Sequence, residues 1–138
     1  MEYPKILCID YGYKKIGLAI SDDLNITAMK LGVLKNNGLA ISEIVKIINE
    51  KKVEIILIGK PSFITVLQHK NVDEFFTELS RQVAADITFV NEDFTTREAK
   101  NILLSQNKKK SRLAKQKDAN QDDILAAQIM LQSFLSEM

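Results

Sequence analysis

The sequence predicts one α/β domain, built on a mixed five-stranded sheet with helices on both faces. Three short apolar runs follow one another closely before residue 35, which is typical of an antiparallel meander. After residue 39, amphipathic stretches of helical period alternate with β-branched runs, which predicts parallel strands joined by right-handed crossovers. The length of 138 residues and the lack of a Pro/Gly/Ser-rich linker favour a single domain over residues 1–138.

The antiparallel part is predicted from residues 6–34. Residues 6–9 form an apolar run that ends at Asp10, as expected of a buried strand. A turn containing Gly12 separates it from a second strand over residues 16–20, and a link this short implies a hairpin. Residues 26–34 are then expected to add a third strand to the meander.

The second half alternates helices and strands. Residues 39–51 and 71–83 place apolar side chains on one helical stripe, which predicts two amphipathic helices. Residues 53–58 and 87–90 are β-branched or aromatic runs, which predict strands buried on both faces. Each predicted helix is therefore followed by a strand.

Two further helices are expected after the last strand. Residues 95–98 have the Thr-x-x-Glu form of a capping box, so a helix is expected to begin there and to end near residue 105. Residues 107–117 are polar and basic, which fits an arm that grips nucleic acid or a solvated loop. A last helix is predicted over residues 120–135, with Ile124, Ala127 and Leu131 on its apolar side.

Composition narrows the class of protein. With 46% hydrophobic and 27% charged residues, the chain can bury a core and remain in solution. Its net charge of +1 does not by itself indicate a nucleic-acid partner, so any such partner must be bound by local basic patches. No apolar stretch reaches the roughly 20 residues of a membrane-spanning helix, and no signal-peptide core is present at the start. The single cysteine, Cys8, rules out an internal disulfide. A cytoplasmic protein without membrane contact is expected.

Three carboxylates fall where this fold would bring them together. Asp10 closes the first strand, Glu92 follows the last strand, and Asp123 lies in the first turn of the last helix. Ligands of open α/β sheets gather beyond the carboxyl ends of the strands. Two carboxylates about 4 Å apart repel by roughly 4 kcal/mol at an effective dielectric near 20, so such a cluster needs cations or protons. Oxygen ligands alone favour Mg²⁺ or Mn²⁺, which assist the hydrolysis of phosphodiesters. Each of the three residues taken singly is more often a cap or a surface group, and only their joint placement on one sheet edge favours a metal site.

Four residues near these carboxylates are candidates for binding substrate. Lys14 and Lys15 follow Asp10 in the predicted turn, where they would meet a phosphate or simply face solvent. Thr95 and Thr96 are first explained as helix caps. A helix that starts beside the last strand would also present backbone N–H groups to a phosphate.

Two tyrosines are further candidates for binding substrate, whereas the single histidine is not. Tyr11 and Tyr13 lie near the proposed site and are candidates for stacking on a base. The only histidine, His69, is predicted in a loop and is given no role.

The sequence of residues 8–22, Cys-Ile-Asp-Tyr-Gly-Tyr-Lys-Lys-Ile-Gly-Leu-Ala-Ile-Ser-Asp, closely resembles the opening signature of the YqgF/RuvX family. Residues 56–61, 92–96 and 123–135 resemble three later blocks of that family, in the same order. The resemblance implies an RNase H-like fold and an activity described as Holliday-junction resolvase-like or as pre-16S rRNA nuclease. It places the family's acidic residues on Asp10, Glu92 and Asp123. Asp122 is a neighbour, but Asp123 keeps the family spacing to Ala126 and Ala127.

The chain departs from the family pattern at three places. Asn91 stands where the family usually has Asp, and Asp93 where it has an Arg that would help to hold phosphate. Residues 62–67 lack the glycine-containing polar loop that is common in the family. These departures bear on catalytic rate and substrate binding more than on the fold.

Three functions compete on this reading. The first is a nuclease dependent on Mg or Mn that processes the 5′ end of pre-16S rRNA, acting as a monomer or weak homodimer, with branched DNA as the alternative substrate. The second, motivated by Asp93, is a nucleic-acid-binding protein with weak or lost catalysis. The third is an ATP-binding protein, because Asp-x-Gly also opens actin-like phosphate loops. Those proteins need two such domains, and 138 residues hold one.

Overall fold

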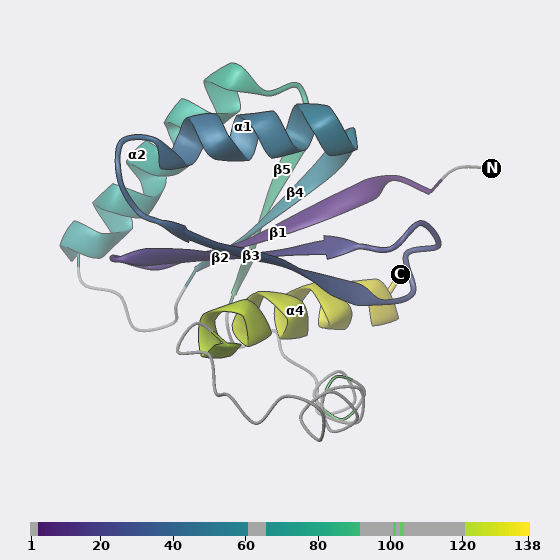
Figure 1. The fold of residues 1–138 in the computed structure, drawn as a ribbon. Coiled ribbons are helices and arrows are strands. Elements are labelled where there is room, and N and C mark those ends of the chain that lie inside the picture. The colour runs from purple at the N-terminus through teal and green to yellow at the C-terminus, as the bar shows by residue number, and fades with distance from the viewer. Residues whose placement is uncertain (1–2, 61–65, 92–100, 102, 104–120) are drawn as a thin grey trace.

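The computed structural model describes residues 3–60, 66–91, 101, 103 and 121–138. Within them a five-stranded sheet lies between helices α1 and α2 on one face and helix α4 on the other (Figure 1). The three layers agree with the predicted α/β class. The elements are β1 (Lys5–Tyr11), β2 (Lys15–Ser21), β3 (Ala28–Lys35), α1 (Ala40–Lys51), β4 (Val53–Lys60), α2 (Val66–Gln82), β5 (Asp86–Asn91) and α4 (Gln121–Ser136).

The sheet is mixed, as predicted, and its strand order is β3-β2-β1-β4-β5. The meander β1-β2-β3 pairs antiparallel, whereas β1, β4 and β5 run parallel. The first strand therefore lies at the centre, with its hairpin on one side and the crossover strands on the other. The carboxyl ends of β1, β4 and β5 consequently meet at one edge of the sheet.

The face under α1 and α2 holds the larger part of the core. Leu7, Ile9, Ile56 and Ile58 point to this face from the two central strands, and Leu79 meets them from α2; all five are fully buried. Alternate residues of a strand point to opposite faces, so these odd positions of β1 and even positions of β4 form one continuous apolar layer. Burying each such side chain contributes roughly 1.5–3 kcal/mol, which makes this layer the main stabilising contact.

The opposite face is covered by α4. Ile6 and Cys8 of β1 and Leu57 of β4 point to it and pack against Met130 and Leu131 of the helix. Polar side chains add to this packing. The Gln132 side chain accepts a hydrogen bond from the Ala28 N–H at 3.0 Å and donates one to the Ile26 carbonyl at 2.8 Å, while Gln128 donates to the Ala28 carbonyl at 3.3 Å. These bonds hold α4 to the start of β3.

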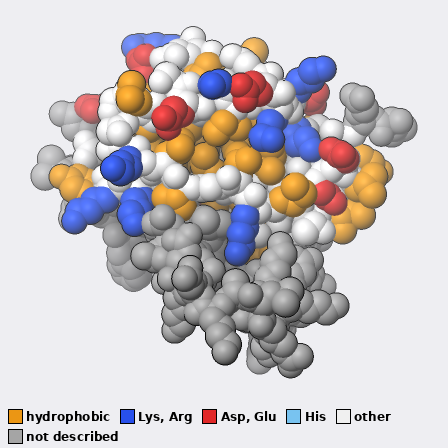
Figure 2. Space-filling view, viewed as in Figure 1, with side chains coloured by type: hydrophobic (Ala, Val, Ile, Leu, Met, Phe, Trp, Pro, Cys, Tyr) orange, Lys and Arg blue, Asp and Glu red, His pale blue; other side chains and the backbone are white. Residues whose placement is uncertain are grey.

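Strand β3 forms one edge of the sheet and contains a β-bulge. Leu18 pairs with Gly32 but the next residue, Ala19, pairs with Lys30, so Leu31 has no partner in the register. Gly32 has φ of +153°, which side chains rarely allow. Figure 2 shows hydrophobic side chains gathered in the centre of this side of the molecule. A bulge on an exposed edge disfavours the pairing of this edge with another strand.

Two element boundaries differ clearly from the predicted ones. Helix α2 begins at Val66, earlier than predicted, so His69 lies in a helix and the prediction of a loop at that position was wrong. Strand β3 begins at Ala28, because Asp22 binds the preceding N–H groups in a turn. Asn101 and Leu103 are helical, whereas the capping box at 95–98 and the basic stretch at 107–117 lie outside the described residues.

No helix in the described ranges has the length and apolar character needed to cross a bilayer.

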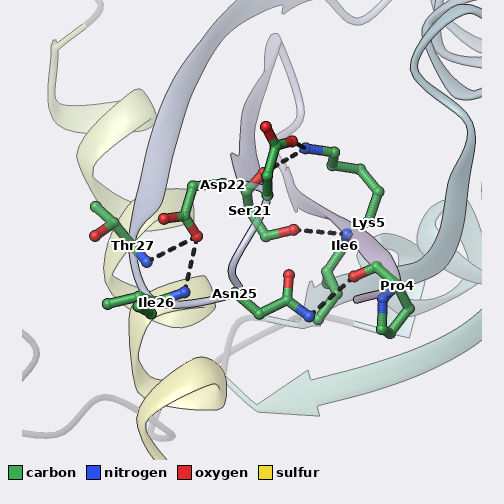
Figure 3. A network of polar contacts seen from close by, with 9 residues as sticks. Pro4, Lys5, Ile6, Ser21, Asp22, Asn25, Ile26 and Thr27 are labelled. Carbon is green, nitrogen blue, oxygen red and sulfur yellow. Dashed lines mark hydrogen bonds and ion pairs between the residues drawn. The ribbon is translucent and has the colours of Figure 1, made fainter. Parts of the chain in front are cut away.

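A polar network closes the end of the sheet opposite to the carboxyl end of β1 (Figure 3). The Ile6 N–H donates to Ser21 Oγ at 2.8 Å, and Asn25 Nδ2 donates to the Pro4 carbonyl at 3.0 Å. One oxygen of Asp22 accepts from the N–H groups of Ile26 and Thr27, at 2.8 and 3.2 Å. Ser21 and Asp22 end the opening motif, and the structure gives both a role in holding β1, β2 and the β2–β3 turn together.

Replacing Asp22 by alanine is expected to lower the free energy of unfolding by about 1–2 kcal/mol, because two backbone donors lose a charged acceptor. The neighbouring Asp23 is the matched control. It is exposed, and its carboxylate contacts Lys5 at 2.8 Å, where the hydrogen bond and charge of that lysine lower the pKa of Asp23. Urea unfolding of both alanine variants measures the difference, and equal midpoints would contradict the role assigned to Asp22.

Candidate active site

Asp10 is the central residue of the candidate site. It is the second-last residue of β1 and follows Ile6 and Cys8 on the side of the strand that faces α4. Its side chain is half-buried at the edge where β1, β4 and β5 end. The sequence predicted this location from a strand-ending aspartate, and the structure confirms the strand and its parallel neighbours.

Both residues beside Asp10 in the sheet are glycines. Asp10 pairs with Gly17 of β2 and with Gly59 of β4. Neither contributes a side chain next to the carboxylate, so the sheet itself does not crowd it. At Gly59, the Met130 side chain of α4 occupies the place that a side chain would take, because an added Cβ would lie 2.5 Å from Met130 Sδ. Gly59 therefore lets α4 approach the sheet closely next to Asp10.

Of the other two predicted carboxylates, Asp123 lies in a described helix, whereas Glu92 can be related to Asp10 only by its place in the sequence. Asp10, Gly59 and Val90 lie in one row across β1, β4 and β5, and Glu92 comes two residues after Val90 in the chain. Glu92 itself lies outside the described residues. Asp123 belongs to α4, seven residues before Met130, which corresponds to about 10 Å along a helix. Because Gln132, near the C-terminal end of α4, contacts the start of β3, the N-terminal end of the helix, which contains Asp123, points toward the Asp10 end of the sheet.

The charge of Asp10 acts on its neighbour Cys8. The thiol is completely buried, and this burial, together with the negative charge of Asp10, raises the pKa of Cys8 far above its ordinary value. The thiol therefore stays protonated and unreactive at physiological pH. The structure assigns Cys8 to the core under α4, with no part in chemistry.

Asp10 is the one member of the predicted donor set whose side chain the structure describes. Among the described side chains, no three His, Cys, Asp or Glu residues come together, and the side chains of Glu92 and Asp123 lie outside that set. Asp10 is a half-buried carboxylate with glycines on both sides in the sheet, which leaves it accessible to an ion and its ligands. Carboxylate oxygens without imidazole or thiolate favour Mg²⁺ or Mn²⁺.

The predicted substrate-binding residues are divided between described and undescribed segments. Lys14, in the β1–β2 turn, and Lys15, the first residue of β2, are exposed, and together with Tyr11 and Tyr13 they line a surface pocket of about 620 Å³. Thr95 and Thr96 lie outside the described residues.

Sequence reasoning missed the part of the pocket wall that comes from the β3–α1 turn and from α2. Residues 36–38, Asn-Asn-Gly, signalled a turn, but nothing in the sequence showed which other turn it would contact.

Comparison with known proteins identifies the family. The model of the family described as "RuvX: Holliday junction resolvase" matches residues 4–137. The chain belongs to the RuvX family. This confirms the resemblance that was inferred from the opening motif, and the enzyme class predicted from the sequence, a nuclease acting on phosphodiesters, is that of the family.

Curated relatives of this RuvX chain match it over nearly their whole length. A protein of Malacoplasma penetrans is 34% identical over 140 residues, covering 96% of this chain and 94% of the relative. One of Dictyoglomus turgidum is 35% identical over 143 residues, covering 97% and 95%. Both carry the name "Putative pre-16S rRNA nuclease".

Solved structures show the same fold at low identity. RuvC of T. thermophilus, determined in complex with a Holliday junction substrate, has a TM-score of 0.66 at 12% identity and covers 99% of this chain and 96% of its own. The fowlpox virus Holliday junction resolvase has a TM-score of 0.59 at 12% identity, covering 97% and 99%. These likenesses confirm the RNase H-like fold.

Proposed function

We propose that this RuvX-family chain is a divalent-metal-dependent nuclease that processes the 5′ end of pre-16S rRNA. The observation that carries the proposal is the position of Asp10, half-buried at the edge where three parallel strands end and flanked by two glycines. The names of the relatives from Malacoplasma penetrans and Dictyoglomus turgidum supply the substrate class. We place the activity in the cytoplasm and expect a monomer or weak homodimer.

Asp10, Glu92 and Asp123 would hold Mg²⁺ or Mn²⁺. When bound there, such an ion lowers the pKa of a water molecule and offsets charge on the scissile phosphate. Asp10 orients the site from a rigid central strand, whose neighbours on both sides fix its backbone. Lys14 and Lys15 lie in the turn that follows Asp10 and bind substrate phosphates by charge.

Branched DNA is the second candidate substrate. The family description names a Holliday junction resolvase, and the fold is that of RuvC. A protein that cuts at a four-way junction would use the same carboxylates. The two substrates differ in the 2′-hydroxyl and in strand geometry, so a direct comparison separates them.

The test is cleavage of 5′-labelled pre-16S rRNA leader fragments and of a synthetic four-way DNA junction by the purified chain. Each substrate is incubated with Mg²⁺, with Mn²⁺ and with EDTA. We expect cleavage of the rRNA fragment with either metal and none with EDTA. Cleavage of the junction alone would favour the DNA substrate, and cleavage that persists in EDTA would exclude the metal mechanism. Salt-dependent binding without any cleavage would favour the binding protein that has lost catalysis.

A further inference from the structure

The pocket of about 620 Å³ at the β1–β2 turn is built from three separate segments of the chain. Tyr11, Tyr13, Lys14 and Lys15 come from the end of β1 and the turn into β2. Lys35, Asn36 and Asn37 come from the end of β3 and the turn that leads to α1, and Asn71 comes from α2.

Hydrogen bonds join the two turns that form the pocket. Asn36 Nδ2 donates to the Gly12 carbonyl at 2.8 Å, and the Asn36 N–H donates to the Lys14 carbonyl at 2.9 Å. A Cβ on Gly12 would collide with the carbonyl oxygen of Lys15, so this turn accepts only glycine at that position without moving. The two turns are therefore held together by hydrogen bonds that do not depend on a ligand.

The chemistry of the lining matches a nucleotide. Three lysines supply positive charge for phosphate, and the pocket lining that the structure describes contains no carboxylate to oppose it. Asparagine amides hydrogen-bond to the edges of bases. Tyr11 packs against Phe75, with ring centroids 5.0 Å apart, whereas Tyr13 is 73% exposed and can stack on a base.

The pocket lies next to Asp10 but on the other face of the sheet. Tyr11 follows Asp10 directly in β1 and packs against the core under α1 and α2, whereas Asp10 faces α4. Successive residues of a strand are about 3.3 Å apart and point to opposite faces. A nucleic-acid strand cut at Asp10 therefore meets the pocket as it passes over the edge of the sheet.

We propose that this pocket binds one unpaired nucleotide of the substrate strand, beside the phosphate that is cut. Its base stacks on Tyr13 and meets the Asn71 amide, and its phosphates meet the three lysines. A base held in this way is unavailable for pairing, so the protein selects single-stranded or frayed segments over continuous duplex. This inference rests on the proposed nuclease function for its position beside the cut phosphate, but the binding that it predicts can be measured without cleavage.

The experiment is fluorescence anisotropy with labelled 12-mers in EDTA, which prevents metal-dependent cleavage. Single-stranded RNA, single-stranded DNA and the blunt duplex of the same sequence are compared for the unchanged chain, Tyr13→Ala and Asn71→Asp. Tyr3→Ala is the matched control, because Tyr3 is 53% exposed and lies near the opposite end of β1. We expect both pocket variants to weaken single-strand binding roughly five- to fiftyfold, with less than a twofold change for duplex and for Tyr3→Ala.

Equal losses for duplex and single strand, or no loss in either pocket variant, would overturn the proposal. Binding to one of the two single strands only would show whether the pocket serves RNA or DNA. If the chain binds single strands through Tyr13 but cuts nothing with metal, the pocket stands and the nuclease function fails. If it cuts with metal but binds single strands as it binds duplex, the nuclease function stands and the pocket fails.

Discussion

Replacing Asp10 by asparagine is expected to reduce metal-dependent cleavage at least about a hundredfold. Loss of a group that only supports a metal ligand already costs 10- to 100-fold, and loss of a ligand costs more. The substitution keeps the shape of the side chain but removes the charge that attracts Mg²⁺ or Mn²⁺. Initial rates on the rRNA fragment, over a range of Mn²⁺ concentrations, measure the change.

Asp22→Asn is the matched control for this variant. Asp22 belongs to the same opening motif and is also half-buried, but it lies in the β2–β3 turn at the other end of the sheet (Figure 3). An asparagine oxygen can still accept the two backbone hydrogen bonds at that place, so the fold is expected to be retained. The control should cleave at nearly the unchanged rate. Similar rates for both variants would remove Asp10 from the proposed site.

Metal binding supplies a second readout for Asp10. A ligand that binds only the folded state raises its stability, by about 2.7 kcal/mol when present at 100 times its Kd. Mn²⁺ is therefore expected to raise the Tm of the unchanged chain and of Asp22→Asn, and to leave that of Asp10→Asn nearly unchanged. An equal rise in all three proteins would place the ion elsewhere.

Replacing Gln132 by alanine is expected to lower the free energy of unfolding by roughly 2–3 kcal/mol and the Tm by roughly 6–12 °C. Gln132 is 2% exposed, and its side chain binds both the Ala28 N–H and the Ile26 carbonyl. Alanine would leave the N–H of Ala28, itself 1% exposed, buried without an acceptor. An unpaired buried donor costs more than the hydrogen bond contributes.

Gln82→Ala is the control for this prediction. Gln82 is an exposed glutamine at the end of α2, and within the described part of the chain its side chain contacts Glu78, at 2.9 Å, so its loss should change stability by less than about 0.5 kcal/mol. Thermal unfolding followed by circular dichroism compares the two variants. If Gln132→Ala is no less stable than Gln82→Ala, the polar contacts do not hold α4 to β3. Because α4 carries Asp123, Gln132→Ala is also expected to weaken Mn²⁺ binding.

Local pattern was sufficient for most of the elements. The five strands and helices α1 and α4 lie close to their predicted positions, because β-branched runs and helical stripes are local consequences of side-chain shape and burial. Helix α2 was predicted too short, since residues 66–70 lie before its clear amphipathic stripe. The location of Asp10 at a strand end was also local, and parallel strands then place it at a ligand-binding edge.

By itself the sequence determined the α/β class, the order of the elements and the family, because each depends on short-range pattern or on a contiguous motif. Only the tertiary structure decided what distant segments do together. It paired Asp10 with Gly17 and Gly59, joined Gln132 to Ala28, and brought Asn36 and Asn71 to the turn after β1. Such contacts arise from the close packing of whole elements, so no local pattern in the chain records them.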